Sequence, residues 1–265
     1  MKTYLLASLT LLLVCCYVGI VGITFAADPD AGEMEMLVFP EKYNPMAVSN
    51  GGTISGVVKF EGEMPEMKVL EITKDVKICG ATEKYDESVV VGEDNALKNT
   101  IVYLIDITEG KDFDQEATLE IDQKNCKFTP HVQIVPLGQR LVMLNNDRVN
   151  HNVHIFSSIN RPVNKQQTKN QKKLRLAGVK KAEGPVSVKC DIHGWMSAWI
   201  AYVPHPYFAV TNEKGEFTLE DVPAGTYKLG YWHEACGTNN EAPVEVTVEA
   251  GGTVTQEFTL KLMMK

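Results

Sequence analysis

The chain has 265 residues, a length that leaves one large domain or two smaller ones open. Hydrophobic residues make up 44% and charged residues 23%, which is ordinary for a folded, soluble protein. The formal net charge of −8 and the pI near 5.3 argue against nucleic acid as the main partner.

The chain begins with a candidate export segment. One positive charge at Lys2 precedes an apolar run from about Tyr4 to Ala26, and acidic residues follow from Asp28. The run also approaches the ~20 residues that span a bilayer. Residues 1–27 are therefore predicted to be a signal peptide or an N-terminal anchor. Either one places the mature chain in the periplasm or outside the cell, with membrane contact only if the segment is retained.

The next part of the chain changes from a linker to β-structure. Residues 28–47 carry five acidic residues and no sustained periodicity, which predicts a linker. Residues 51–60 alternate apolar with small or polar side chains, and residues 100–105 form an apolar run, so both are expected to be strands. No long amphipathic pattern appears in the mature chain, and we predict an all-β protein.

One short segment carries the strongest chemistry. Residues 190–196, with the sequence CDIHGWM, place the thiolate of Cys190, the imidazole of His193 and the thioether of Met196 in one loop. The flanking residues 185–189 and 198–203 have strand patterns. Soft sulfur ligands beside imidazole suit copper, and an upstream residue, His151, completes a set of two histidines, one cysteine and one methionine. A structural zinc site is less suited, because thioethers are poor zinc ligands.

The ligand spacing and the Asn-rich segment around the first histidine resemble the cupredoxins, in particular the plastocyanin- and amicyanin-like members, over residues 113–204. The resemblance implies a Greek-key β-sandwich with one type 1 (blue) copper ion. It also implies that Asn152 bonds across to the loop of Cys190, and we expect Trp195 to pack over the site and exclude water. Gly194 stands where related sequences often have proline.

Four cysteines remain after the export segment: Cys79, Cys126, Cys190 and Cys236. If Cys190 binds the metal, an odd number is left in an oxidising compartment. We favour a disulfide between Cys79 and Cys126, with Cys236 free or competing for the pairing.

The C-terminal part is predicted to form a second β-sandwich. Residues 207–219 have the pattern of a hairpin, and further strand patterns follow in residues 222–229, 244–248 and 254–260. Their G-x-F-x-L and P-x-G-x-Y-x-L motifs resemble the carboxypeptidase regulatory-like domain, a transthyretin-like sandwich. We predict a discontinuous domain of residues 48–112 plus 205–265, into which the cupredoxin module is inserted. Two β-domains in series are the alternative.

The remaining histidines, His131, His154, His205 and His233, are expected to be structural or exposed rather than ligands. Residues 161–183 hold eight Lys or Arg and one Glu, a net charge of +7. This basic segment is either a solvated loop or a docking patch for an acidic partner.

These features predict an electron carrier rather than an enzyme, with a redox protein such as a cytochrome or dehydrogenase as its partner. Copper trafficking or storage without electron transfer is the main alternative. A structural or adhesive module with a vestigial metal is another. The sequence holds no hydrolase elbow, phosphate loop or dinucleotide motif, and too few histidines for a multicopper cluster.

Overall fold

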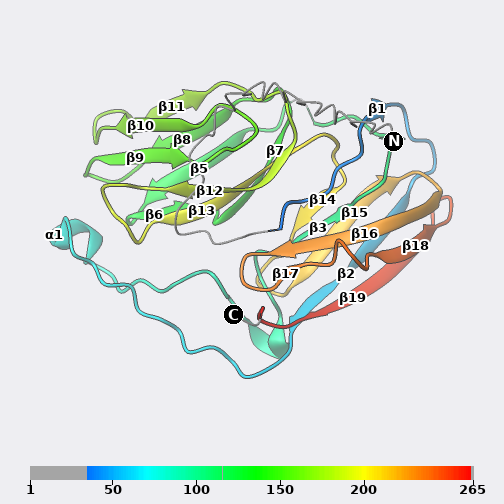
Figure 1. The fold of residues 1–265 in the computed structure, drawn as a ribbon, viewed down its shortest axis with the longest axis horizontal. Coiled ribbons are helices and arrows are strands. Elements are labelled where there is room, and N and C mark those ends of the chain that lie inside the picture. The colour runs from blue at the N-terminus through cyan, green and yellow to red at the C-terminus, as the bar shows by residue number, and fades with distance from the viewer. Residues whose placement is uncertain (1–34, 115, 264–265) are drawn as a thin grey trace, which may run out of the picture.

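A computed structural model describes residues 35–114 and 116–263 (Figure 1). The predicted signal peptide or anchor lies outside these residues. Within them, helical structure is limited to α1 (Val76–Cys79) and a 3-10 turn, η1 (Glu93–Asn95), so the predicted all-β class is confirmed. In the same described part of the chain, none of the helices has the length and apolar character that a bilayer crossing requires.

Residues 119–203 form the first sandwich. One sheet has the strand order β10-β9-β12-β13-β7, and the facing sheet has the order β11-β8-β5-β6. The strands are β5 (Leu119–Lys124), β6 (Lys127–Thr129), β7 (Val132–Pro136), β8 (Leu141–Asn145), β9 (His151–Ile155), β10 (Val163–Gln167), β11 (Lys173–Leu176), β12 (Glu183–Lys189) and β13 (Ser197–Val203).

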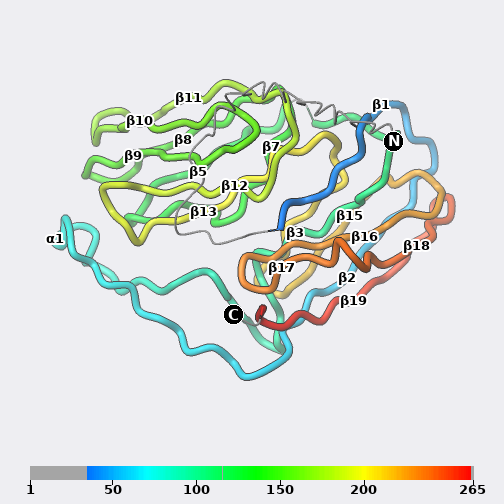
Figure 2. The backbone as a smooth tube through the Cα atoms, viewed as in Figure 1, coloured from blue at the N-terminus to red at the C-terminus, as the bar shows by residue number. Residues whose placement is uncertain are grey.

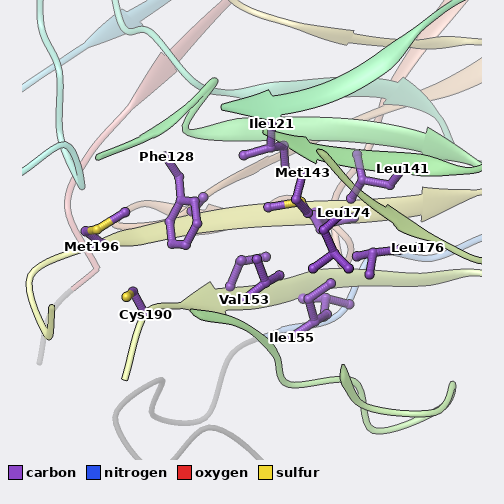
Figure 3. Packing of buried hydrophobic residues seen from close by; sticks show 14 of the residues in the cluster. Ile121, Phe128, Leu141, Met143, Val153, Ile155, Leu174, Leu176, Cys190 and Met196 are labelled. Atoms are coloured by element: carbon purple, nitrogen blue, oxygen red, sulfur yellow. The ribbon is translucent and has the colours of Figure 1, made fainter. Parts of the chain in front are cut away.

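The core of the first sandwich follows from strand alternation. Leu141 and Met143 on β8 face Val153 and Ile155 on β9, and all four side chains are buried in one cluster (Figure 3). Successive residues of a strand point to opposite faces, so His151 lies on the same inner face as Val153. The core therefore carries a potential ligand at its edge.

The second sandwich is built from chain segments on both sides of the first. One sheet has the order β14-β3-β16-β17, with β18 also pairing with β16, and the other has the order β15-β2-β19. The bounds are β2 (Gly52–Phe60), β3 (Ile101–Leu104), β14 (Phe208–Val210), β15 (Glu216–Val222), β16 (Gly225–His233), β17 (Gly237–Thr238), β18 (Val244–Val248) and β19 (Thr253–Leu260). A short parallel pair joins β1 (Asn44–Pro45) to β4 (Glu109–Gly110).

The pairing within the second sandwich connects distant parts of the sequence. Strand β2 pairs in parallel with β19 along eight residues and antiparallel with β15. Its alternating pattern buries Ile54, Val58 and Phe60 in a core shared with Phe217 and Phe258. Segments before and after residues 119–203 thus share one core. The exact domain boundaries, and the likeness to a regulatory-like domain, stay predictions.

A long excursion, residues 61–99, leaves β2 and returns to β3. Figure 2 shows it running beside the first sandwich to α1, which lies at the end of that sandwich away from the second. A disulfide between Cys79 and Cys126, with an S–S distance of 2.01 Å, ties the excursion to the first sandwich. Ile72 and Cys79 pack into the core of that sandwich, although they lie in the sequence range predicted for the other domain.

Candidate metal centre

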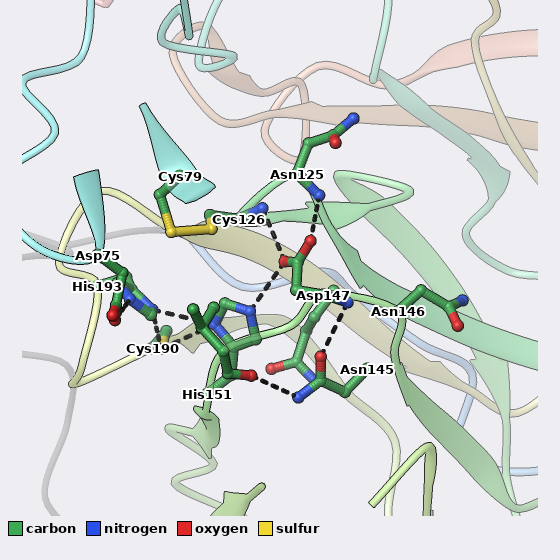
Figure 4. Close-up of polar contacts among 12 residues, drawn as sticks. Asp75, Cys79, Asn125, Cys126, Asn145, Asn146, Asp147, His151, Cys190 and His193 are labelled. Atoms are coloured by element: carbon green, nitrogen blue, oxygen red, sulfur yellow. Dashed lines mark hydrogen bonds and ion pairs between the residues drawn. A yellow bond between two sulfur atoms is a disulfide. The ribbon is translucent and has the colours of Figure 1, made fainter. Parts of the chain in front are cut away.

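Three predicted ligands meet at one end of the first sandwich (Figure 4). Nδ1 of His151 lies 3.0 Å from Nδ1 of His193, and Sγ of Cys190 lies 3.7 Å from the His193 nitrogen and 3.9 Å from the His151 nitrogen. Both imidazoles are 0% exposed and Cys190 is 1% exposed. The two rings meet edge to face, with centroids 4.8 Å apart.

Neighbouring strands bring these side chains together. His151 is the first residue of β9, and Cys190 follows directly after the end of β12. The two strands pair antiparallel, with Lys189 opposite His154. The start of β9 and the end of β12 therefore lie at the same end of the sheet. The turn after Cys190 is closed by N–H groups of Cys190 and Met196, which donate to the carbonyls of Met196 and His193 at 3.3 and 2.9 Å.

Each histidine is held through its outer nitrogen by a carboxylate. Nε2 of His151 donates to Asp147 Oδ2 at 2.9 Å, and Nε2 of His193 donates to Asp75 Oδ2 at 2.9 Å. Such bonds fix the tautomer and leave Nδ1 of each ring facing the third donor, Cys190. Asp147 also accepts the backbone N–H groups of Asn125 and Cys126 at 2.7 and 2.8 Å.

Sequence reasoning missed both carboxylates. Asp147 lies four residues before His151, in the Asn-Asn-Asp segment that begins at the last residue of β8, and this spacing could have indicated a contact. Asp75 is 118 residues away from His193 and sits in an irregular loop. No periodicity in the sequence connects it to the site.

The charge state of the thiol is set by two opposing effects. Burial raises the pKa of Cys190, but hydrogen bonds from His151, His193 and the N–H of Asn152 lower it, and the net pKa is about 6. Burial lowers the pKa of His151, while its bonds to Asp147 and Cys190 raise it, and the net direction is upward. The pair therefore favours a thiolate, which is the metal-binding form of cysteine.

Asn152 connects the two ligand segments. Its Oδ1 accepts the Asp191 N–H at 2.5 Å, its Nδ2 donates to Asp191 Oδ2 at 2.8 Å, and its own N–H points to Cys190 Sγ at 3.5 Å. These contacts hold the strand that carries His151 against the loop that carries the thiolate.

Trp195 and Met196 complete the loop. The indole Nε1 of Trp195 donates to the Cys126 carbonyl at 3.1 Å, and its ring centroid is 5.1 Å from that of His193. Met196 is 1% exposed and belongs to the same buried cluster as Cys190; Figure 3 shows both at one end of that cluster.

The other four histidines lie outside the ligand triangle. His154 bonds to Asp191 at 2.9 Å and stacks on Phe156. Burial lowers the pKa of His205 to about 3 and that of His233 to about 4, so both are neutral structural residues.

The donor set fits a transition-metal ion. In the plane of the two Nδ1 atoms and the Cys190 Sγ atom, the point equidistant from all three lies about 2.1 Å from each. This distance is close to the ~2.0–2.3 Å bonds that zinc-sized ions make with imidazole nitrogen and thiolate. Two imidazoles and a thiolate in a trigonal arrangement, with a thioether on the same loop, are the donors that copper takes in electron-transfer sites.

A hollow of about 380 Å³ lies just outside the centre. Asp75 and Ile192 line it next to the ligand loop, and three cations, Lys74, Arg148 and Lys169, surround it. Cations thus outnumber the one carboxylate, Asp75, in the lining of this hollow, although the whole chain is acidic.

Comparisons with known proteins give a limited likeness. No protein-family profile matches the chain, and no curated protein matches it. Among solved structures, the copper-containing nitrite reductase NirK from Thermus scotoductus SA-01 is 19% identical with a TM-score of 0.30, over 34% of this chain and 23% of that one. A reduced Cu(I) amicyanin variant is 16% identical with a TM-score of 0.28, over 34% of this chain and 85% of its own. A purple cupredoxin from Nitrosopumilus maritimus is 14% identical with a TM-score of 0.27, over 32% and 98%.

Proposed function

We propose that this chain binds one copper ion through His151, Cys190 and His193, with Met196 as a weak axial ligand, and acts as a one-electron carrier. The observation that carries the proposal is the buried triangle of two imidazole nitrogens and one thiolate sulfur, whose size suits a copper ion. The bound ion would supply a Cu(II)/Cu(I) couple.

The residues of the chain act by holding one geometry. Asp147 and Asp75 orient the two imidazoles, and Asn152 keeps the loop of the thiolate against the strand of His151. Because the positions of the ligands are fixed by hydrogen bonds and packing, little rearrangement accompanies a change of charge at the centre. Buried ligands also favour exchange of electrons with a docked protein over direct binding of a substrate.

The two buried free thiols of the described chain give a matched pair of variants for the test. Cys190 and Cys236 are the free cysteines in residues 35–114 and 116–263. We expect the Cu(II)-loaded protein to show an intense visible thiolate-to-copper band, which Cys190→Ser abolishes and Cys236→Ser retains. A copper-loaded wild-type protein without the band would contradict the electron-carrier function.

Copper trafficking or storage is the second candidate. It is favoured by exposed methionines on the excursion, since Met64 is 51% and Met67 is 76% exposed and thioethers bind Cu(I). A colourless Cu(II) complex, together with loss of Cu(I) uptake in Met64→Leu/Met67→Leu, would support this candidate over electron transfer.

An acidic redox protein outside the cytoplasm, such as a cytochrome or dehydrogenase, is the partner that we propose. The cations around the hollow support docking there, and the disulfide between Cys79 and Cys126 suits an oxidising compartment. Lys172 of the basic segment instead donates to the Asn145 carbonyl at 3.0 Å and has a structural role. Electron transfer should slow with added salt and in Arg148→Glu/Lys169→Glu; no change in either would remove this partner.

A further inference from the structure

The excursion closes the metal centre from one side. Asp75 immediately precedes α1, and its carboxylate accepts the hydrogen of His193 Nε2, so the chain covers a ring that would otherwise face solvent. The His193 side chain is 0% exposed, whereas that of Asp75 is 39% exposed. Asp75 is thus the outermost layer on this side.

The same excursion is joined to the other side of the centre. Cys79, at the end of α1, forms the disulfide with Cys126, whose N–H donates to Asp147 Oδ2. That same oxygen accepts Nε2 of His151. The two carboxylates that orient the two imidazoles are therefore connected through one disulfide, as Figure 4 shows.

The short helix depends on these attachments. It has four residues, too few to be stable alone, and Val76 and Ile78 are 56% and 39% exposed. The buried ammonium group of Lys84 donates to the carbonyls of Cys79 and Thr82 and anchors the end of the helix. Removing an attachment should loosen the segment between Ile72 and Cys79, two residues that themselves pack into the sandwich core.

The carboxylates that bond to the two imidazoles differ in their exposure to solvent. The Asp147 side chain is 7% exposed and is held by two backbone N–H groups, while Asp75 is more than five times as exposed and lines the hollow outside the centre. The His193 side is therefore the easier route between solvent and the ligands.

We propose that residues 72–79 are a latch over the metal centre, that Asp75 is the positioning residue of His193, and that copper enters and leaves when the latch opens. The identity of the ion rests on the proposed function, whereas the latch follows from the contacts of Asp75, Cys79 and His193. The excursion that carries residues 72–79 extends from the second sandwich. The second sandwich thereby contributes a residue that contacts a ligand of the metal centre in the first.

Release of Cu(I) tests the latch without any electron-transfer assay. The loaded protein is mixed with an excess of the chelator bathocuproine disulfonate, and the half-time of transfer is measured. We expect Asp75→Ala to release copper about tenfold or more faster, as expected when an outer partner of a ligand is lost. Asp75→Asn should lie between the two, because its amide oxygen still accepts a hydrogen bond. Lys77→Ala, an exposed change on the same helix, is the control and should match wild type.

A second measurement follows the histidine protons directly. In the Cu(I) protein, the Nε2 proton of His193 should exchange slowly with solvent in wild type and rapidly in Asp75→Ala. The Nε2 proton of His151, held by Asp147, should stay protected in both and serves as the internal control. Cys79→Ser/Cys126→Ser should also speed both release and His193 exchange, and the Asp75 variants decide the matter if this variant does not fold.

Two results would overturn the latch: release from Asp75→Ala no faster than from Lys77→Ala, or rapid exchange of the His193 proton in wild type. Failure of the latch can be told apart from failure of the proposed electron-carrier function. A protein without the visible band whose Cu(I) release still depends on Asp75 loses the electron-carrier function and keeps the latch. A coloured protein indifferent to Asp75 loses the latch alone.

Discussion

Asp147 joins a ligand histidine to the disulfide-bonded segment of the chain. It accepts Nε2 of His151 and two backbone N–H groups, and it is buried. Burial raises its pKa, but its bonds to His151 and to the N–H of Cys126 lower it, and the net direction is downward. The carboxylate is therefore charged at neutral pH and supports both the ligand and the disulfide segment.

Asp147→Ala should lower both stability and copper affinity. The change leaves the partly buried N–H of Asn125 without its acceptor, and it does the same to two buried donors, the N–H of Cys126 and Nε2 of His151, at about 1–3 kcal/mol for each buried group. We expect the unfolding free energy of the metal-free protein to fall by about 2–6 kcal/mol, measured in urea, and the copper affinity to fall about 10- to 100-fold.

Glu120→Ala is the control for Asp147→Ala. Glu120 makes a partly exposed ion pair with Lys173 at 3.8 Å, which is worth little, so its loss should change stability by under about 1 kcal/mol. Equal effects of the two substitutions would show that Asp147 has no special role.

At the scale of the elements, the alternation of apolar and polar residues in the sequence predicted the positions of strands. Predicted strands at residues 51–60 and 185–189 correspond to β2 (Gly52–Phe60) and β12 (Glu183–Lys189), because both runs alternate in sequence, although β12 is buried on both faces up to Lys189. The ligands at strand ends could be predicted for the same reason. Asp75 could not, since it reaches His193 through a loop whose path depends on a distant disulfide and not on any local pattern.

One carboxylate in β12 organises the connection from β9 to β10. Glu183 is 1% exposed and accepts the N–H groups of Ser158, Ile159 and Asn160 at 2.5, 2.9 and 3.1 Å, and also the Ser157 hydroxyl. Burial raises its pKa, but these bonds lower it further, so the group is charged when folded. The sequence showed Glu183 only as one acid in a basic segment.

Glu183→Gln should destabilise the protein at neutral pH. An amide has the same shape but places an NH2 group against N–H donors, and we expect a loss of about 2–4 kcal/mol in the unfolding free energy. Because the folded pKa of Glu183 is depressed, its contribution is present above the unfolded value of about 4.3 and is lost as the pH falls through the folded pKa.

The difference between wild type and Glu183→Gln should therefore shrink as the pH falls below about 4, in urea unfolding at a series of pH values. The exposed change Glu241→Gln is the control and should be nearly neutral throughout. A difference that does not depend on pH would mean that Glu183 is not held as a carboxylate.

On the scale of the whole molecule, the two sandwiches meet through a third core. Trp199 on β13 packs edge to face on Trp232 of β16, with centroids 5.5 Å apart, and Ile101 and Val132 join the same cluster. The metal centre lies at the opposite end of the first sandwich, near α1 (Figure 1). The second sandwich thus holds the first from one end and covers its site at the other through the excursion.

An ion pair beside this third core makes the contact between the two sandwiches depend on pH. His131, just before β7, lies 2.6 Å from the Glu234 carboxylate, just after β16, and their side chains are 4% and 19% exposed. Burial lowers the pKa of His131, but the hydrogen bond and charge of Glu234 raise it, and the net direction is upward. A raised folded pKa means that the pair contributes fully below the unfolded value of about 6.5 and that the contribution is lost as the pH rises through the folded pKa.

Glu234→Gln should therefore cost most in mildly acidic solution. We expect it to lower the unfolding free energy by about 1–3 kcal/mol near pH 6, since it removes the charge opposite a buried imidazolium, and by less near pH 9, since the contribution of the pair is lost as the pH rises through the folded pKa of His131. Urea unfolding at the two pH values measures the difference, and the exposed Glu245→Gln serves as the control. A cost that stays constant or grows with rising pH would show that His131 is neutral at this contact, and the sandwiches would then be held together by Trp199, Trp232 and their apolar neighbours alone.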